Sequence, residues 1–162
     1  MAILAGRVIS AADVTMPAVV TNFGNGTNTV TSTSFAVLPS TSCTASITNA
    51  HPTANMLTLV TYGAWMSATA NDVRMSLDIS GAVTIAAGIG GGAAVGYGEI
   101  PIVSLPTGAT SSSSFHGQGT FTVELPPGTT TFKTYAMRSS ASGTQNCNYP
   151  TIRLVPLYYL FS

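Results

Sequence analysis

The most suggestive chemical motif in the sequence is the glycine-rich run from Gly88 to Ala93, which reads GIGGGA. It follows an expected strand and fits a relaxed form of the fingerprint that binds dinucleotides. That fingerprint needs a helix N-terminus for the pyrophosphate and an acidic residue about 20 positions later for the ribose. The glycines between Gly91 and Gly98 disfavour a helix, and no acidic residue lies near position 110. We therefore predict a loop here, with no bound nucleotide and no other cofactor.

The two histidines, His51 and His116, are the candidates for acid–base or metal chemistry. Neither has a cysteine or carboxylate at the spacing of metal ligands, so no metal site is predicted. His116 alternates with Gln118, Thr120 and Glu124 on the polar side of its segment, as a surface histidine does. A Ser-His-Asp triad is assembled in space rather than in sequence, but the chain has no G-x-S-x-G elbow. We predict no catalytic residue and no enzymatic activity.

Two cysteines, Cys43 and Cys147, are present. They can form a disulfide only if the fold brings their Cα atoms within about 7 Å. The first 14 residues have no basic region before their short apolar run, so they do not resemble a secretory signal. Without export the thiols begin reduced. Two buried thiols are the favoured interpretation, and the pairing stays open.

Four aromatic residues could line a sugar site through ring stacking: Tyr62, Trp65, Tyr97 and Tyr149. Trp65 lies in an apolar segment, so packing in the core is the favoured interpretation of that residue. A carbohydrate-binding module, with a cell-surface glycan as its partner, is kept as an alternative function.

The composition indicates a single domain with a weakly charged surface. Hydrophobic residues make up 45% of the 162 residues and charged residues only 6%, whereas an ordinary globular chain carries about a quarter charged residues. The net charge is zero, which argues against nucleic-acid binding because phosphate contacts need a basic surface. No apolar run is long enough to span a membrane. Because such a surface gives little protection against association, we expect part of it to be covered in an assembly.

Apolar and polar residues alternate along several short segments, which predicts strands. Residues 72–80 place Arg74 and Asp78 on the outer face and four apolar side chains on the inner one: Val73, Met75, Leu77 and Ile79. Residues 115–137 alternate on both sides of Pro126-Pro127-Gly128, which predicts an antiparallel hairpin. Further strands are predicted over residues 29–37, 43–48, 56–66, 83–86, 97–103 and 151–161.

About eight to nine short strands joined by Gly/Pro turns predict an all-β fold, a single antiparallel β-sandwich or a barrel. Residues 1–27 are interpreted as an N-terminal arm and residues 28–162 as the sandwich domain. The last strand, residues 151–161, is apolar on both faces, with Ile152, Leu154, Tyr158 and Leu160 on one of them. Such a strand needs cover on both sides, and we expect a second subunit to provide part of it.

The segment Ala5 to Val14, AGRVISAADV, resembles the opening of many virion proteins of tailed phages. The body resembles small jelly-roll proteins encoded by phages of actinobacteria, in four segments: residues 57–66, 72–81, 125–130 and 149–157. The resemblance implies a jelly-roll-like β-sandwich and a structural role as a head decoration, head fibre or minor tail protein. It brings no catalytic residues. Because the chain has no heptads or fibre repeats, a decoration protein on the outer head surface is the favoured role, and a tail-tip or baseplate component is the alternative.

These considerations predict a homo-oligomer, with a trimer as the expected form, located on the phage particle and assembled in the host cytoplasm. Its other partners would be the major capsid protein or other virion proteins. The oligomer contact is predicted at the loop from Gly88 to Gly98 or at the end of the last strand: Leu157, Tyr158, Tyr159, Leu160 and Phe161. The attachment arm is predicted to act through its apolar residues: Ile3, Leu4, Val8, Ile9 and Val14.

Overall fold

The computed structural model describes residues 15–38, 43–68, 73–88, 102–104, 114–139 and 143–160, and within them the chain is all-β without a helix. These residues form nine strands: β1 (Val20–Phe23), β2 (Ala36–Val37), β3 (Thr44–Asn49), β4 (Asn55–Ala68), β5 (Val73–Gly81), β6 (Val103–Ser104), β7 (Ser114–Leu125), β8 (Gly128–Arg138) and β9 (Gln145–Leu160). The predicted all-β class is confirmed.

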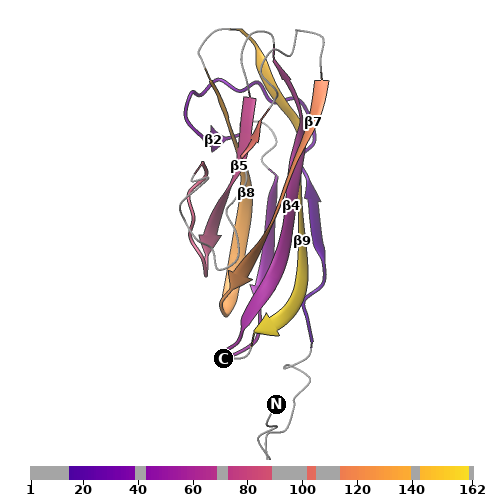
Figure 1. Cartoon of the computed structure of the whole chain (residues 1–162), viewed down its shortest axis with the longest axis vertical. Coiled ribbons are helices and arrows are strands. Elements are labelled where there is room, and N and C mark those ends of the chain that lie inside the picture. Colours follow the sequence, from indigo (N-terminus) through magenta and orange to yellow (C-terminus); the bar gives the residue numbers. More distant parts are fainter. Residues whose placement is uncertain are drawn as a thin grey trace, which may run out of the picture.

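The strands form two antiparallel sheets that pack face to face (Figure 1). Sheet A has the order β1-β9-β4-β7. Sheet B has the order β2-β8-β5-β6, with β3 also paired to β8. Because β2 and β3 pair with successive parts of β8, they act as one interrupted edge strand. With these two counted together, the strands form two four-stranded sheets in the order of a jelly roll, with β5 and β6 as consecutive strands of sheet B. This confirms the predicted fold.

The predicted hairpin over residues 115–137 is wrong. Both strands exist, but β7 pairs with β4 in sheet A whereas β8 pairs with β5 in sheet B. The connection is therefore an arch between the sheets, at the lower end of Figure 1. Pro126 and Pro127 have no N–H to donate to a ladder. Asn49 instead ties the arch, because its buried Nδ2 donates to the carbonyl of Leu125 at 2.9 Å and to that of Ala54 at 2.8 Å.

Strand β5 places its apolar side chains in the core, as predicted. Four of them have no exposed surface: Val73, Met75, Leu77 and Ile79. Arg74 is exposed and Asp78 is half-buried. Ser76 was expected on the same outer face but is buried. The backbone N–H of Gly88 donates to its Oγ at 3.1 Å, so the segment after β5 folds back over this serine.

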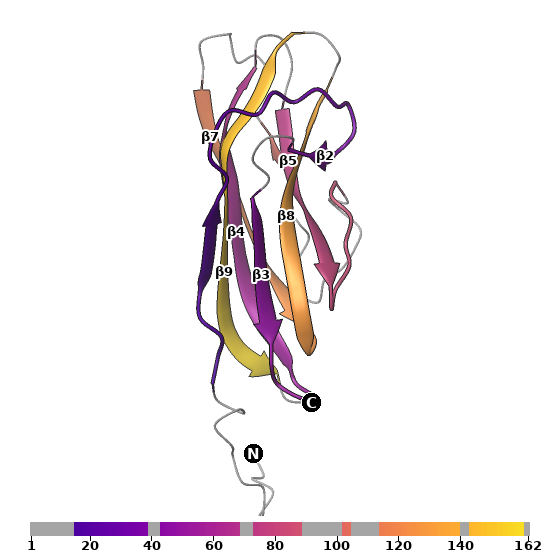
Figure 2. The ribbon, with the colours of Figure 1, turned by 180° about the vertical axis from the view of Figure 1, so that it is seen from behind.

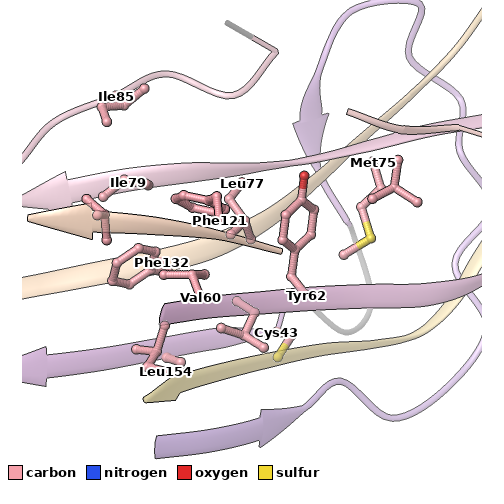
Figure 3. Close-up of a cluster of buried hydrophobic side chains, with 14 of the residues drawn as sticks. Cys43, Val60, Tyr62, Met75, Leu77, Ile79, Ile85, Phe121, Phe132 and Leu154 are labelled. Atoms are coloured by element: carbon pink, nitrogen blue, oxygen red, sulfur yellow. The ribbon is translucent and has the colours of Figure 1, made fainter. Parts of the chain in front are cut away.

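The core fills the space between the two sheets (Figure 3). Sheet A contributes Tyr62, Phe121 and Leu154, and sheet B contributes Leu77 and Phe132. The rings of Tyr62 and Phe121 meet edge to face with centroids 6.3 Å apart. These contacts give one continuous core, as a single domain requires.

The domain boundary predicted at residue 27 is wrong, because β1 belongs to the sandwich. Val20 to Phe23 pair antiparallel with Thr151 to Leu154 of β9, and Figure 2 shows the two strands side by side. The edge of β9 that faces away from β4 accounts for this, because its ladder hydrogen bonds would be unpaired without β1. The strand predicted over residues 29–37 is correspondingly short: Thr29 forms a single bridge to Asn146, and only β2 follows.

Strand β9 contains two β-bulges where it pairs with β4. Thr58 pairs with Pro156 and Leu57 with Tyr158, so Leu157 is the extra residue of one bulge. The other lies between Asn148 and Thr151, where Tyr149 has a φ of 50°. Proline cannot donate to a ladder and is confined to edges or bulges within a sheet. Pro156 lies beside the first bulge and Pro150 within the second.

Candidate functional site

The outer faces of the two sheets differ in chemistry. Four of the charged residues in the described ranges lie on sheet B, and only Glu124 and Arg153 lie on sheet A; those of sheet B are Arg74, Asp78, Lys133 and Arg138. Six of the nine exposed large apolar side chains in the described ranges lie instead on strands of sheet A: Phe23, Trp65, Phe115, Tyr149, Leu157 and Tyr158. Of these, Phe115 pairs with the buried Met66 and so lies on the inner side of its strand. An exposed apolar face with few charges is where a partner or ligand is expected to bind.

Trp65 lies on the outer face of sheet A, so its predicted packing in the core is wrong. Its side chain is 48% exposed, whereas Ala64 and Met66 beside it are fully buried. Strand β4 is apolar on both faces, and composition alone did not indicate which face is inside. His116, confirmed on the polar outer side of β7, pairs with Trp65 across the sheet. Their ring centroids are 5.3 Å apart at an interplanar angle of 66°, so the histidine supports the indole from the side.

The other proposed sugar-stacking residues separate in the structure. Tyr62 is completely buried in the core, and burial raises the pKa of its hydroxyl far above the usual value. Tyr149 is 52% exposed and follows Asn148, the partner of Trp65 on β9. Tyr97 lies outside the described residues. Of the four, the structure leaves Trp65 and Tyr149 available at the surface.

A groove lies on the same face over β1, β9 and β4, and Trp65 is not among its lining residues. Phe23, Thr151 and Arg153 are among its lining residues. Phe23 is the most exposed large apolar side chain in the described part of the chain, at 69%. It pairs with Thr151, which in turn pairs with Gly63, two residues before Trp65. Phe23 was not predicted as a site residue because residues 1–27 were interpreted as an arm. The run VVTNF nevertheless has a strand-like composition.

No protein-family model matches the chain, and no curated protein does. Several solved structures match the chain in fold, among them the following two. Eiger TNF from S. frugiperda matches with a TM-score of 0.46 and 8% identity, over 89% of this chain and 96% of that one. CBM35 from Cellvibrio japonicus Abf62 matches with a TM-score of 0.34 and 16% identity, over 83% of this chain and 92% of that one. At these values the similarities carry no argument about function.

The predicted oligomer contact at the end of β9 is divided by the bulge at Leu157. Leu157 and Tyr158 are 41% and 53% exposed, and Leu160 is half-buried. Tyr159 is turned inward, where it is 8% exposed and its hydroxyl donates to the carbonyl of Thr15 at 3.0 Å. The predicted oligomer contact is therefore wrong for Tyr159. The prediction that Tyr158 shares a face of the strand with Leu154 is also wrong. Phe161 lies outside the described residues.

His51 has a structural position rather than a catalytic one. It is 1% exposed, and its ring centroid lies 5.0 Å from that of Tyr159. Its Nδ1 accepts the backbone N–H of Ala54 at 2.7 Å and that of Thr53 at 3.1 Å. These bonds close the turn between β3 and β4. Among the described residues no group of three or more His, Cys, Asp and Glu side chains could hold a metal ion.

Both cysteines are buried and unpaired. Burial raises the pKa of Cys147 from its ordinary 9.0 to about 12. For Cys43 burial again dominates and raises the pKa to about 11, partly offset by backbone hydrogen bonds to the sulfur. Both groups are therefore protonated at neutral pH, and neither has the low pKa of a reactive thiol.

Several sequence-based predictions fall outside the described residues. These are the apolar residues of the arm, Ile3, Leu4, Val8, Ile9 and Val14, and most of the glycine-rich run, 89–93. Within the described ranges, no helix is long and apolar enough to cross a membrane.

Proposed function

We propose that this chain is a structural protein of a tailed-phage particle, which acts as a homo-oligomer on the outer surface of the head. The resemblance of residues 5–14 and of four segments of the body supports the virion role. The single structural observation that supports assembly is the exposure of Leu157 and Tyr158 on a face with few charges. We call these two residues, with the half-buried Leu160, the β9-end patch.

The β9-end patch has the properties of the centre of a protein–protein contact. Tyr158 combines a large apolar ring with a hydroxyl, and tyrosine is enriched among residues that dominate binding energy. The bulge directs Leu157 and Tyr158 outward, where they are free to enter a second subunit. A specific contact around them would bury at least about 1,000 Å² in total. A closed ring of three copies would remove the patch from solvent, and a trimer is the form we propose.

The proposed attachment segment is now shorter than 27 residues. Deleting residues 1–27 would remove β1 and the carbonyl of Thr15 that binds Tyr159. A deletion that tests attachment to the major capsid protein or to another virion protein must therefore end at residue 14. Loss of incorporation into particles, with unchanged thermal unfolding of the shortened protein, is the expected result.

We also propose that the protein is not an enzyme. Its only described histidines support a turn and a surface tryptophan, and its two thiols are protonated. Isothermal titration calorimetry with NAD and ATP is expected to show no saturable binding.

Antibody labelling of intact particles tests the virion role directly. Gold particles over the head are expected, in a number consistent with many copies. Labelling confined to the tail would replace the head location with the tail-tip or baseplate alternative. Absence of the protein from purified, intact particles by mass spectrometry would contradict the proposed function.

A further inference from the structure

The outer face of sheet A carries two exposed aromatic rings on strands that lie on either side of β9. Phe23 on β1 and Trp65 on β4 are 69% and 48% exposed. The register runs from Phe23 through Thr151 to Gly63, two residues before Trp65. Strand spacing and rise put the two aromatic Cα atoms about 12 Å apart. We propose that this surface, which we call the Trp65–Phe23 site, binds an oligosaccharide.

Gly63 lies between Phe23 and Trp65 in the register and carries no side chain, whereas its partner Thr151 carries a half-buried one. A Cβ built at this position would lie 2.5 Å from the carbonyl oxygen of Gly117 on β7, so the close approach of β4 and β7 excludes any larger residue. The groove lined by Phe23, Thr151 and Arg153 lies beside this glycine. A ligand can therefore approach the backbone at Gly63, with the Thr151 side chain beside it.

Aromatic rings with polar groups around them suit the two sides of a sugar. A pyranose presents C–H groups that stack on an aromatic face, and hydroxyl groups that need hydrogen-bond partners. Asn148 pairs with Trp65 on β9, and its Oδ1 already accepts the backbone N–H of Asn28 at 3.0 Å, which fixes the amide. Its Nδ2 can donate to a hydroxyl, as can the Arg153 guanidinium at the other end of the site.

Two features indicate that the site is held in shape before a ligand binds. The contact between His116 and Trp65, with centroids 5.3 Å apart, limits the orientations of the indole. Tyr149, which follows Asn148, has a φ of 50°, a conformation that residues other than glycine rarely adopt. Such residues persist only where the surrounding structure holds them in place, here a β-bulge, and they are frequent at ligand sites. The exposed Tyr149 ring is a candidate third stacking surface.

The charge of the surface favours an oligosaccharide over a basic peptide. Arg153 is the charged residue among those that line the groove, and no carboxylate lines it within the described residues. A basic peptide would meet a like charge there. Hydroxyl groups, by contrast, accept hydrogen bonds from arginine without an opposing charge.

The site lies apart from the β9-end patch, so the two proposals are independent. Tyr158 pairs with Leu57, eight residues before Trp65 on β4, which corresponds to about 26 Å along the strand. Loss of sugar binding therefore need not change the oligomeric state, and a monomer could still bind sugar.

Trp65 is the single tryptophan of the chain, which makes it a direct reporter. Wild-type protein is titrated with cellohexaose, maltohexaose and mannohexaose while the tryptophan emission is recorded, and is also applied to an array of neutral and acidic glycans. We expect a saturable change of emission with at least one hexasaccharide, or with a glycan that binds on the array. Phe23→Ala retains the reporter and should weaken that binding by about tenfold or more.

Trp65→Ala removes the reporter, so its binding is measured by calorimetry, with the same loss expected. Ser46→Ala, an exposed change on β3 in the opposite sheet, is the control and should bind as wild type. The proposal is overturned if no glycan binds, or if both aromatic variants bind as tightly as wild type. It is also overturned if the emission changes on dilution together with a fall in mass, since a second copy would then cover the site.

Discussion

Tyr158 and Tyr159 are consecutive in β9 but lie on opposite faces of sheet A, one 53% exposed and the other 8% exposed. Regular alternation explains their opposite directions, but the bulge at Leu157 determines which of them points inward. Without the bulge, Tyr158 would share the inner face with Leu154 and the ring of Tyr159 would face solvent.

Substitutions at these two tyrosines distinguish effects on stability from effects on assembly. We expect Tyr159→Ser to lower the free energy of unfolding by about 3–5 kcal/mol, because it removes a buried ring that packs on His51. Tyr158→Ser should change it by less than about 1 kcal/mol, as exposed substitutions do. Urea unfolding of both variants in dilute solution checks this. Equal losses would show that the inward and outward positions are assigned wrongly.

The packing of the core predicts that Leu77→Ala lowers the free energy of unfolding strongly. Leu77 has no exposed surface and lies between the sheets with Phe132 and Tyr62. Truncation should cost about 2–5 kcal/mol, as for other buried leucines. Arg74→Ala on the exposed face of the same strand is the control and should cost less than about 1 kcal/mol. A loss below about 1 kcal/mol for Leu77→Ala would contradict the assignment of the core.

Asn49 is expected to be a stabilising residue of the β7–β8 arch. Its Nδ2 donates to the carbonyls of Ala54 and Leu125, and its Oδ1 accepts the N–H of His51 at 3.0 Å. Asn49→Ala removes the partner of three backbone groups, at a cost of about 3 kcal/mol or more from typical penalties of about 1–3 kcal/mol for each unsatisfied group. Thr48→Ala loses an exposed hydroxyl contact with Thr129 and should have a much smaller effect in thermal unfolding.

The buried thiols predict a dependence of stability on alkaline pH. Because burial raises the pKa of Cys43 to about 11 and that of Cys147 to about 12, the unfolded chain loses these protons first, above about pH 9. The contribution of the two protonated thiols to the free energy of unfolding is therefore complete below about pH 9. It is lost as the pH rises through the pKa values of the folded protein. The high pKa of Tyr62 acts in the same direction.

Thiol titration measures the burial of the two cysteines directly. With a disulfide reagent at pH 8, both thiols should react slowly in the native protein and rapidly in denaturant. Cys43→Ser and Cys147→Ser assign the signals. Rapid reaction of either thiol in the folded protein would contradict its burial.

Strict alternation allowed part of the fold to be predicted from the sequence. Val73 to Ile79 alternate cleanly because β5 has one face in the core and one largely in solvent. The same pattern could not identify partners: β7 and β8 alternate equally well in two different sheets, so a hairpin and an arch look alike along the chain. The arch depends on Asn49, which is 76 residues from Leu125, and no local pattern reveals that contact.

The candidate sites were harder to predict, because both lie where strands are apolar on two faces. Trp65 follows a run of apolar residues in β4, and only its register with His116 shows that it faces outward. Pro150 and Pro156 lie at the two bulges of β9, as proline disrupts a ladder in a central strand, but we predicted no bulge from them. They did not indicate how the bulges redirect Tyr149 and Tyr158.

The most direct test of assembly is the mass of the purified protein by multi-angle light scattering at micromolar concentration. The account predicts a mass of three chains of 16.5 kDa each for the wild type, unchanged in Trp65→Ala. The Leu157→Ser/Tyr158→Ser double variant is predicted to be a folded monomer. A wild-type protein with the mass of one chain at this concentration would contradict self-association through the β9-end patch, and so would a double variant that keeps the mass of the wild type.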